Sequence, residues 1–243
     1  MHNKVKDSLS VIIPVGPGEA AYCKLLQDLF NRPFEQRIEV IFSAIEQPPS
    51  DLNQSIPPHV KFIWIAGKKG RAEQLNRGAK AAMGETLWFV HADSRFDNPQ
   101  IMKMLTTKCG QKKNSFFYFD LRFSSDGPRL MPLNQLGVWI RSHIFGIPFG
   151  DQAFVINRHL FWQLGGFRED VPYGEDHLFV WAARHAGFPI QPIGHYVFTS
   201  ARRYELHGWG KTTIKHMWLT FLQTIPLAIN LVFKKRLKKG KQL

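Results

Sequence analysis

Two adjacent acids, Glu175 and Asp176, follow Gly174 and open an apolar stretch with helical spacing. Acids in the first turn of a helix interact favourably with its dipole, so the pair can be purely structural. A carboxylate can also act as a general base when it lies within hydrogen-bond reach of an acceptor hydroxyl. From these residues alone, both interpretations stay open.

A third acid, Asp93, follows the apolar residues 87–90 after His91 and Ala92. It is predicted to lie at the end of a buried strand, where a nucleotide diphosphate and its divalent cation can bind. Carboxylate oxygens suit hard cations such as Mg²⁺ or Mn²⁺. An Asp after a strand is also common as a helix cap or turn residue.

A basic residue, Arg71, follows Gly70 at the start of a predicted helix that also carries Asn76. The amino end of a helix, together with an arginine, favours phosphate binding. The alternative is a solvated charged face on a packed helix.

These residues must be positioned by strands and helices that alternate along the chain. Short apolar runs predict strands over residues 9–15, 38–44, 60–66, 86–90, 116–123 and 153–156. Apolar residues at helical spacing predict helices over residues 20–30, 72–83, 133–143, 158–164 and 175–186. The alternation predicts an α/β fold with a mainly parallel central sheet flanked by helices. Ligands of such sheets bind at the carboxyl ends of the strands.

The composition supports a globular protein in a reducing compartment. With 243 residues, 44% of them hydrophobic, the chain has the size of one large α/β domain, which excludes a disordered or collagen-like protein. Two cysteines, Cys23 and Cys109, do not suffice for a disulfide framework or a cysteine-based zinc site. Residues 1–8 are polar and no apolar leader follows them. We therefore expect a cytoplasmic protein.

The charge predicts an anionic partner. Lys and Arg total 32 against 19 acids, for a formal charge of +13, and six basic residues lie between positions 234 and 241. Residues 217–233 are apolar, but they fall short of the ~20 residues of a spanning helix and include polar positions near helical spacing. An amphipathic helix with this tail, over residues 217–241, would bind an anionic membrane surface at the inner face of the membrane. Packing of the helix on the domain is the alternative.

Seven motifs, at familiar spacing, resemble those of family 2 glycosyltransferases. They are Ser10-Val-Ile-Ile-Pro-Val15, Gly70-Arg-Ala-Glu-Gln-Leu-Asn-Arg-Gly78, His91-Ala-Asp93, Gly150-Asp-Gln152, Leu164-Gly-Gly-Phe167, Glu175-Asp176 and Thr199-Ser-Ala-Arg-Arg203. The resemblance covers roughly residues 8–209 and looks closest to small bacterial members, some of which are assigned to arsenosugar biosynthesis. We therefore expect a glycosyltransferase domain over residues 1–209 and a C-terminal helix and tail over residues 210–243.

The resemblance implies a GT-A fold, a nucleotide-sugar donor bound with Mg or Mn, and inversion at the anomeric carbon, with a UDP-sugar favoured. Asp176 matches the catalytic base, with Glu175 beside it, and Asp93 matches the metal-binding acid. Asp151 and Gln152 would line the sugar or acceptor side. Donor contacts are implied for Pro14, Val15, Gly16, Glu46, Arg71, Asn76, Asp93, Arg202 and Arg203.

The chain departs from the family pattern at three places. His91 replaces the first acid of the family's Asp-x-Asp motif, which leaves one carboxylate for the metal. Ser43 and Ala44 stand where an acid and glycines are usual, and Glu46 is shifted by about two residues from the usual acid. Tyr204 stands where the late motif often has tryptophan.

Two other functions are open to this sequence. Gly16, Gly18 and Ala21 follow the first strand at the spacing of an NAD(P)-binding Rossmann fingerprint, with Glu46 near the end of the second strand. That interpretation gives no role to Asp93 or to the acids at 175–176. The other alternative is a degenerate, non-catalytic basic protein that binds a membrane or nucleic acid. Nucleic acid is not expected, because aromatic residues in apolar runs are usually core residues.

Overall fold

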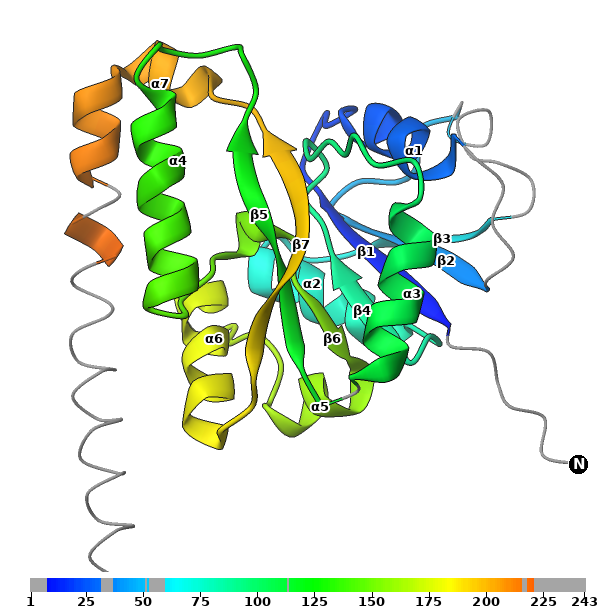
Figure 1. Cartoon of the computed structure of the whole chain (residues 1–243). Helices are drawn as coiled ribbons and strands as arrows, with labels where there is room; N and C mark the ends of the chain where they lie inside the picture. Colours follow the sequence, from blue (N-terminus) through cyan, green and yellow to red (C-terminus); the bar gives the residue numbers. More distant parts are fainter. Residues whose placement is uncertain are drawn as a thin grey trace, which may run out of the picture.

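A seven-stranded sheet forms the centre of the part of the chain that is described here (Figure 1). The computed structural model describes residues 8–31, 37–50, 52, 60–112, 114–215 and 218–220. The strands are β1 (Leu9–Val15), β2 (Ile38–Ala44), β3 (Lys61–Ala66), β4 (Thr86–Phe89), β5 (Phe116–Phe123), β6 (Val155–Asn157) and β7 (Ile190–Thr199). Their order across the sheet is β3-β2-β1-β4-β6-β5-β7.

The sheet is mainly parallel, as the sequence predicts. β1 pairs in parallel with β2 and β4, β2 with β3, and β5 with β7. The short strand β6 runs antiparallel to its neighbours β4 and β5. Because β1 lies between β2 and β4, the strand order reverses there, which is the usual ligand position in open α/β sheets.

Helices cover both faces of the sheet (Figure 1). They are α1 (Tyr22–Phe30), α2 (Arg71–Ala81), α3 (Ile101–Gln111), α4 (Met131–Trp139), α5 (Arg158–Gln163), α6 (Glu175–Ala186) and α7 (Arg202–His207). One hydrophobic cluster packs α1 and α3 on one face, and a second packs α2, α5 and α6 on the other. Burial of these apolar side chains, at about 25 cal/mol per Å², is the main favourable contribution to folding.

The segment after β5 ends in an unusual helical turn. α4 continues directly into the π-helix η2 (Ile140–Ile144), and the 3₁₀-helix η3 (Gly150–Gln152) follows shortly after. The hydroxyl of the buried Tyr118 on β5 donates to the Ser142 carbonyl oxygen over 3.0 Å, which fixes η2 to the sheet. π-turns are rare and often occur at functional sites.

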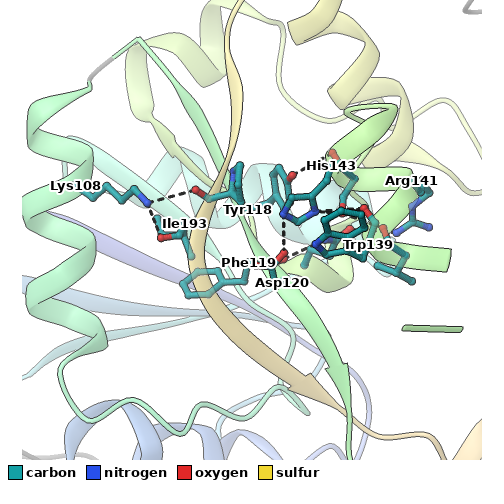
Figure 2. A network of polar contacts seen from close by, with 12 residues as sticks. Lys108, Tyr118, Phe119, Asp120, Trp139, Arg141, His143 and Ile193 are labelled. Carbon is teal, nitrogen blue, oxygen red and sulfur yellow. Dashed lines mark hydrogen bonds and ion pairs between the residues drawn. The ribbon is translucent and has the colours of Figure 1, made fainter. Parts of the chain in front are cut away.

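Most predicted elements are confirmed within a few residues, and residues 9–15, 38–44, 116–123 and 175–186 match β1, β2, β5 and α6. The sequence analysis missed α3 and β7, as well as the short helix α7. β7 contains Pro192 and Gly194, which normally interrupt strands. It tolerates them because it is an edge strand, with a register irregularity opposite residues 118–120. Lys108 of α3 donates to the Ile193 carbonyl oxygen over 2.5 Å, and this hydrogen bond connects α3 to β7 (Figure 2).

The chain beyond α7 is described only in part. Residues 209–215 are helical, and Asn134 of α4 donates to Thr213 Oγ1 over 2.9 Å. Trp209 Nε1 donates to Asn134 Oδ1 over 2.6 Å. Within the described ranges, no helix is both long and apolar enough to cross a membrane. Apart from residues 218–220, the predicted membrane-binding segment 217–241 lies outside the described residues.

Candidate functional site

The carboxyl ends of β1 and β2 are held together by a side chain of α2. The buried Gln74 donates through Nε2 to the carbonyl oxygens of Val15, at 2.9 Å, and Ser43, at 2.7 Å. This contact keeps residues 14–16 beside the first turn of α2, as the donor-site prediction requires. The sequence analysis missed Gln74, whose signal is a polar residue on the apolar face of a helix.

Glu46 lies against the turn that follows β1. Its Oε2 accepts from the Gly18 backbone N–H at 3.3 Å, and its carbonyl oxygen accepts from Trp64 Nε1 at 2.9 Å. Gly18 has a φ of 64°, a left-handed conformation that favours glycine. The structure therefore brings Glu46 and the exposed Gly16 turn to the same edge of the sheet.

Arg71, the first residue of α2, connects this edge to α6. Its Nε lies 3.1 Å from Oε1 of the buried Glu175, and its guanidinium donates to His91 Nε2. Nearly half of the Arg71 side-chain surface stays exposed to solvent. Arg71 can therefore contact a bound anion while it keeps both protein partners.

The His91–Asp93 turn after β4 faces two cations. Burial holds the pKa of His91 well below its usual range, and the charges of Arg71 and Arg203 lower it further, so the imidazole is neutral and Nε2 accepts from Arg71. Burial also raises the pKa of Asp93, and nearby Glu19 adds to that effect, while Arg203 and Arg71 oppose it. An anionic ligand here would meet two guanidinium groups.

A divalent cation fits this turn only if a bound diphosphate supplies some of its ligands. Among the described residues, no group of three His, Cys, Asp or Glu side chains is placed to hold a metal ion. Asp93 offers one carboxylate, and His91 Nε2 already accepts from Arg71. Mg²⁺ commonly binds proteins through one or two carboxylates and takes its other ligands from phosphates and water. The residues thus suit a cation that arrives with a diphosphate.

Asp176 meets η3 beside Arg71. Its Oδ2 accepts from the Gly150 N–H at 2.6 Å, and its Oδ1 accepts from the His177 N–H at 2.8 Å. A Cβ atom at Gly150 would lie 2.7 Å from an Arg71 terminal nitrogen and 3.0 Å from Asp176 Oδ2. A glycine at position 150 therefore lets the arginine, the acid and the η3 backbone converge.

Arg141 of η2 joins this group, and the sequence analysis missed it. It donates to Gln152 Oε1 over 3.1 Å, its guanidinium carbon lies 3.5 Å from the Phe149 ring centroid, and it faces Asp151 and Asp176 electrostatically. Asp151 Oδ1 is buried and has no hydrogen-bond partner among the described residues. Burial and the charge of Asp176 raise the pKa of Asp151, whereas Arg141 and Arg71 lower it.

Three predicted site residues have protein partners outside this group, although Gln152 also accepts from Arg141 within it. The Asn76 amide donates to the Phe167 carbonyl at 2.8 Å and accepts from the Phe167 N–H at 2.9 Å. Gln152 donates to the Phe119 carbonyl oxygen over 3.0 Å. Arg202 is exposed and lies 4.0 Å from Asp126, unlike Arg203, which faces the His91–Asp93 turn. The first two side chains thus position loops in this structure.

Comparison with known families identifies the chain. The family Glycosyl transferase family 2 matches residues 10–160, more than half of the chain. The chain belongs to this family. No similar sequence was found among curated proteins.

Solved structures of glycosyltransferases share the GT-A fold of this family 2 member. The Pyrobaculum calidifontis mannosyltransferase PcManGT, in complex with GDP-Man and Mn²⁺, has a TM-score of 0.64 and 16% identity over 90% of this chain and 64% of its own. TarS of S. aureus has a TM-score of 0.58 and 18% identity over 79% of this chain and 36% of its own. TarS 1–349 in complex with UDP-GlcNAc has a TM-score of 0.55 and 17% identity, over 79% of this chain and 58% of its own. The chain thus spans less than two thirds of the length of these proteins. At these sequence identities, the structural similarity shows a shared fold and no more.

Proposed function

We propose that the chain transfers a sugar, with inversion, from a nucleotide-sugar donor to an acceptor hydroxyl group. The observation that carries this proposal is the convergence of Asp176, Arg71 and the Gly150 backbone beside the turn that holds Asp93. The convergence would supply a base and a cationic diphosphate site next to each other. Such an arrangement matches a displacement at the anomeric carbon.

The donor is proposed to lie across the carboxyl ends of β1, β2 and β4. The turn at residues 14–18 and Glu46 would contact the nucleoside, and Arg71 and Arg203 would contact the diphosphate. Mg²⁺ or Mn²⁺ held by Asp93 would supply further neutralisation of the diphosphate charge. UDP-sugars are our favoured donors, and the complexes of similar folds with UDP-GlcNAc and with GDP-Man and Mn²⁺ support donors of this class.

Asp176 is proposed to accept the proton of the acceptor hydroxyl. As the hydroxyl oxygen bonds to the anomeric carbon, the bond from that carbon to the leaving phosphate oxygen breaks, and the electron pair stays on the diphosphate. The N–H groups of Gly150 and His177 hold the Asp176 carboxylate for this step. Glu175 is turned to Arg71 and positions its guanidinium. Asp151 and Arg141 are proposed to line the acceptor side.

The remaining assignments are also proposals. They are the domain limits at 1–209 and 210–243, a place in the arsenosugar-associated subgroup, a cytoplasmic location, and membrane binding through residues 217–241. Because Asn76 and Gln152 already have protein partners, we propose that both act by positioning loops at the site.

Substitution of the base tests the proposal. Asp176→Asn should abolish release of nucleoside diphosphate from a nucleotide sugar, while nucleotide binding and the unfolding midpoint stay close to wild type. Asn can still accept the Gly150 N–H bond through its carbonyl oxygen but loses the bond from the His177 N–H, so the site should largely keep its shape. Asp170→Asn, at an exposed acid six residues earlier, is the matched control and should keep full activity. Full activity of Asp176→Asn would refute the proposed base.

A further inference from the structure

A pocket of about 230 Å³ lies between β5, β7 and α4, and none of the acids described above lines it. Its lining includes Asp120, Arg122, Leu136, Trp139, Ser142 and Tyr196. None of these residues has a role in the proposed transfer. The size is below the ~300–1,000 Å³ of sites for drug-sized ligands and suits a smaller molecule.

The pocket has a charged floor with unfilled hydrogen-bonding capacity. Arg122 Nε is buried and makes no hydrogen bond within the described part of the chain. Asp120 Oδ1 lies 3.3 Å from Nε2 of His143, a residue of η2 (Figure 2). Buried polar atoms without partners are rare, because each costs about 1–3 kcal/mol. A ligand that brings its own donors and acceptors could pair with the Asp120 and Arg122 side chains that line the pocket.

The rim of the pocket is aromatic. The Trp139 residue is 47% exposed, and its ring stacks on His143 with centroids 4.7 Å apart. Tyr196 is 39% exposed, and the Arg122 guanidinium carbon lies 3.5 Å from its ring centroid. Both rings are therefore fixed by a neighbour while part of their surface remains open. Rigid aromatic surfaces beside paired charged groups suit a ligand with apolar faces and polar edges.

The pocket adjoins the acceptor side of the transfer site. Ser142 lines the pocket, and the preceding residue, Arg141, faces Asp151 and Asp176. Both residues belong to η2, so this helical turn lies between the pocket lining and the acids that Arg141 faces. A ligand long enough to pass this turn would reach both.

We propose that this pocket binds a monosaccharide unit of the acceptor, which makes the acceptor a saccharide or glycoside. A pyranose ring has apolar C–H faces that pack on aromatic rings, and hydroxyl groups at its edge that serve as donors to Asp120 and acceptors from Arg122. The identification of the bound saccharide as part of the acceptor rests on the proposed function. Saccharide binding itself does not require that function.

Direct binding tests the pocket without the transfer reaction. Methyl glycosides of glucose, galactose, mannose and N-acetylglucosamine are titrated into the full chain, and binding is followed by saturation-transfer NMR. We expect at least one glycoside to bind the wild type, with affinity reduced tenfold or more by Trp139→Ala and by Asp120→Asn. Leu133→Ala is the matched control, because Leu133 is 57% exposed on the same helix and does not line the pocket.

The outcomes separate the two proposals. Trp139 is partly exposed, so Trp139→Ala should fold, and its unfolding midpoint verifies this. No glycoside binding to the wild type, or equal binding by wild type and a folded Trp139→Ala, overturns the pocket assignment. UDP and GDP binding is measured on the same variants and should be unchanged. If glycosides bind through Trp139 and no nucleotide binds, the pocket assignment stands and the proposed transfer fails.

Discussion

Arg71 and Glu175 form an ion pair, with Nε and Oε1 3.1 Å apart, between the first turns of α2 and α6. The two residues are more than a hundred positions apart in sequence, and the pair fixes the proposed phosphate contact beside the proposed base. Glu175 is buried, so it depends on this partner. We therefore expect the pair to couple binding of the proposed donor to the position of Asp176.

Replacement of Arg71 should reduce catalysis. Arg71→Gln removes a cation from the diphosphate side and a partner from Glu175, so kcat/KM should fall by about 10²–10³-fold. Steady-state release of nucleoside diphosphate measures this change. Arg168→Gln, at an exposed arginine paired with Asp170, should leave kcat/KM within twofold. Equal effects of the two substitutions would show that Arg71 has no special role.

Arg141 should affect the acid limb of the pH–rate profile through Asp151, which is proposed to line the acceptor side. Its charge favours the ionised form of Asp151, whose pKa is raised by burial and by Asp176 and lowered by Arg141 and Arg71. Arg141→Gln removes one lowering charge, so the pKa of Asp151 should rise and the acid limb should move to higher pH. Arg141→Lys keeps the charge and should keep the limb near its original pH. An unshifted limb in Arg141→Gln would mean that Arg141 only supports packing.

The buried Glu39 should make stability depend on pH in the acid range. Burial alone would raise its pKa, but hydrogen bonds from Ser10 Oγ and the Met83 N–H, both at 2.6 Å, and from the Gly84 N–H, together with the charge of Lys61, lower it below its usual value. A lowered folded-state pKa stabilises the fold above the unfolded-state value of about 4.3. That stability is lost as the pH falls through the folded-state pKa.

Glu39→Gln should therefore lower the free energy of unfolding at pH 7 by about 1–3 kcal/mol. The difference from wild type should shrink between about pH 5 and pH 3. Chemical denaturation at several pH values measures both effects. Glu205→Gln, at an exposed acid, is the control and should show neither effect. A constant difference across this pH range would contradict the assigned ionisation.

Restoring an acid at position 91 should strengthen cation binding. His91→Asp gives the turn a second carboxylate near Asp93, so Mn²⁺ should bind more tightly in the presence of UDP or GDP, by roughly tenfold. Calorimetric titration with Mn²⁺ measures this affinity independently of any enzymatic activity. His195→Asp, at a histidine of β7 that contacts Asn98, is the matched control. Equal Mn²⁺ affinity in wild type and His91→Asp would place the cation away from this turn.

The elements of the donor half were predictable because their signals are local. β1 and β2 are continuous apolar runs, and α2 begins after Gly70, whose φ of 153° favours glycine. Their carboxyl ends had to meet because parallel strands end at one edge of the sheet. The placement of Glu46, Arg71 and Asp93 at one edge followed from that rule.

The acceptor half depends on contacts that the sequence does not display. Arg141 faces Asp176 only because α4 ends in a π-turn, and nothing in residues 131–144 marks that turn. Asn76 lies on the predicted donor helix, yet its amide binds the loop at Phe167, which is distant in sequence. Such long-range pairings decide which polar side chains face a ligand and which support a loop.

The central claim is that the carboxyl edge of β1, β2 and β4 binds a nucleotide sugar, and thermal unfolding with ligands tests it most directly. UDP, GDP, their sugar conjugates and NAD are each added with and without Mn²⁺. A ligand at about 100 times its dissociation constant adds about 2.7 kcal/mol, which raises the midpoint by roughly 5–10 °C for a chain of this size. We predict such a shift for one nucleoside diphosphate and its sugar conjugate, larger with Mn²⁺. A shift with NAD and with no nucleoside diphosphate would contradict the account.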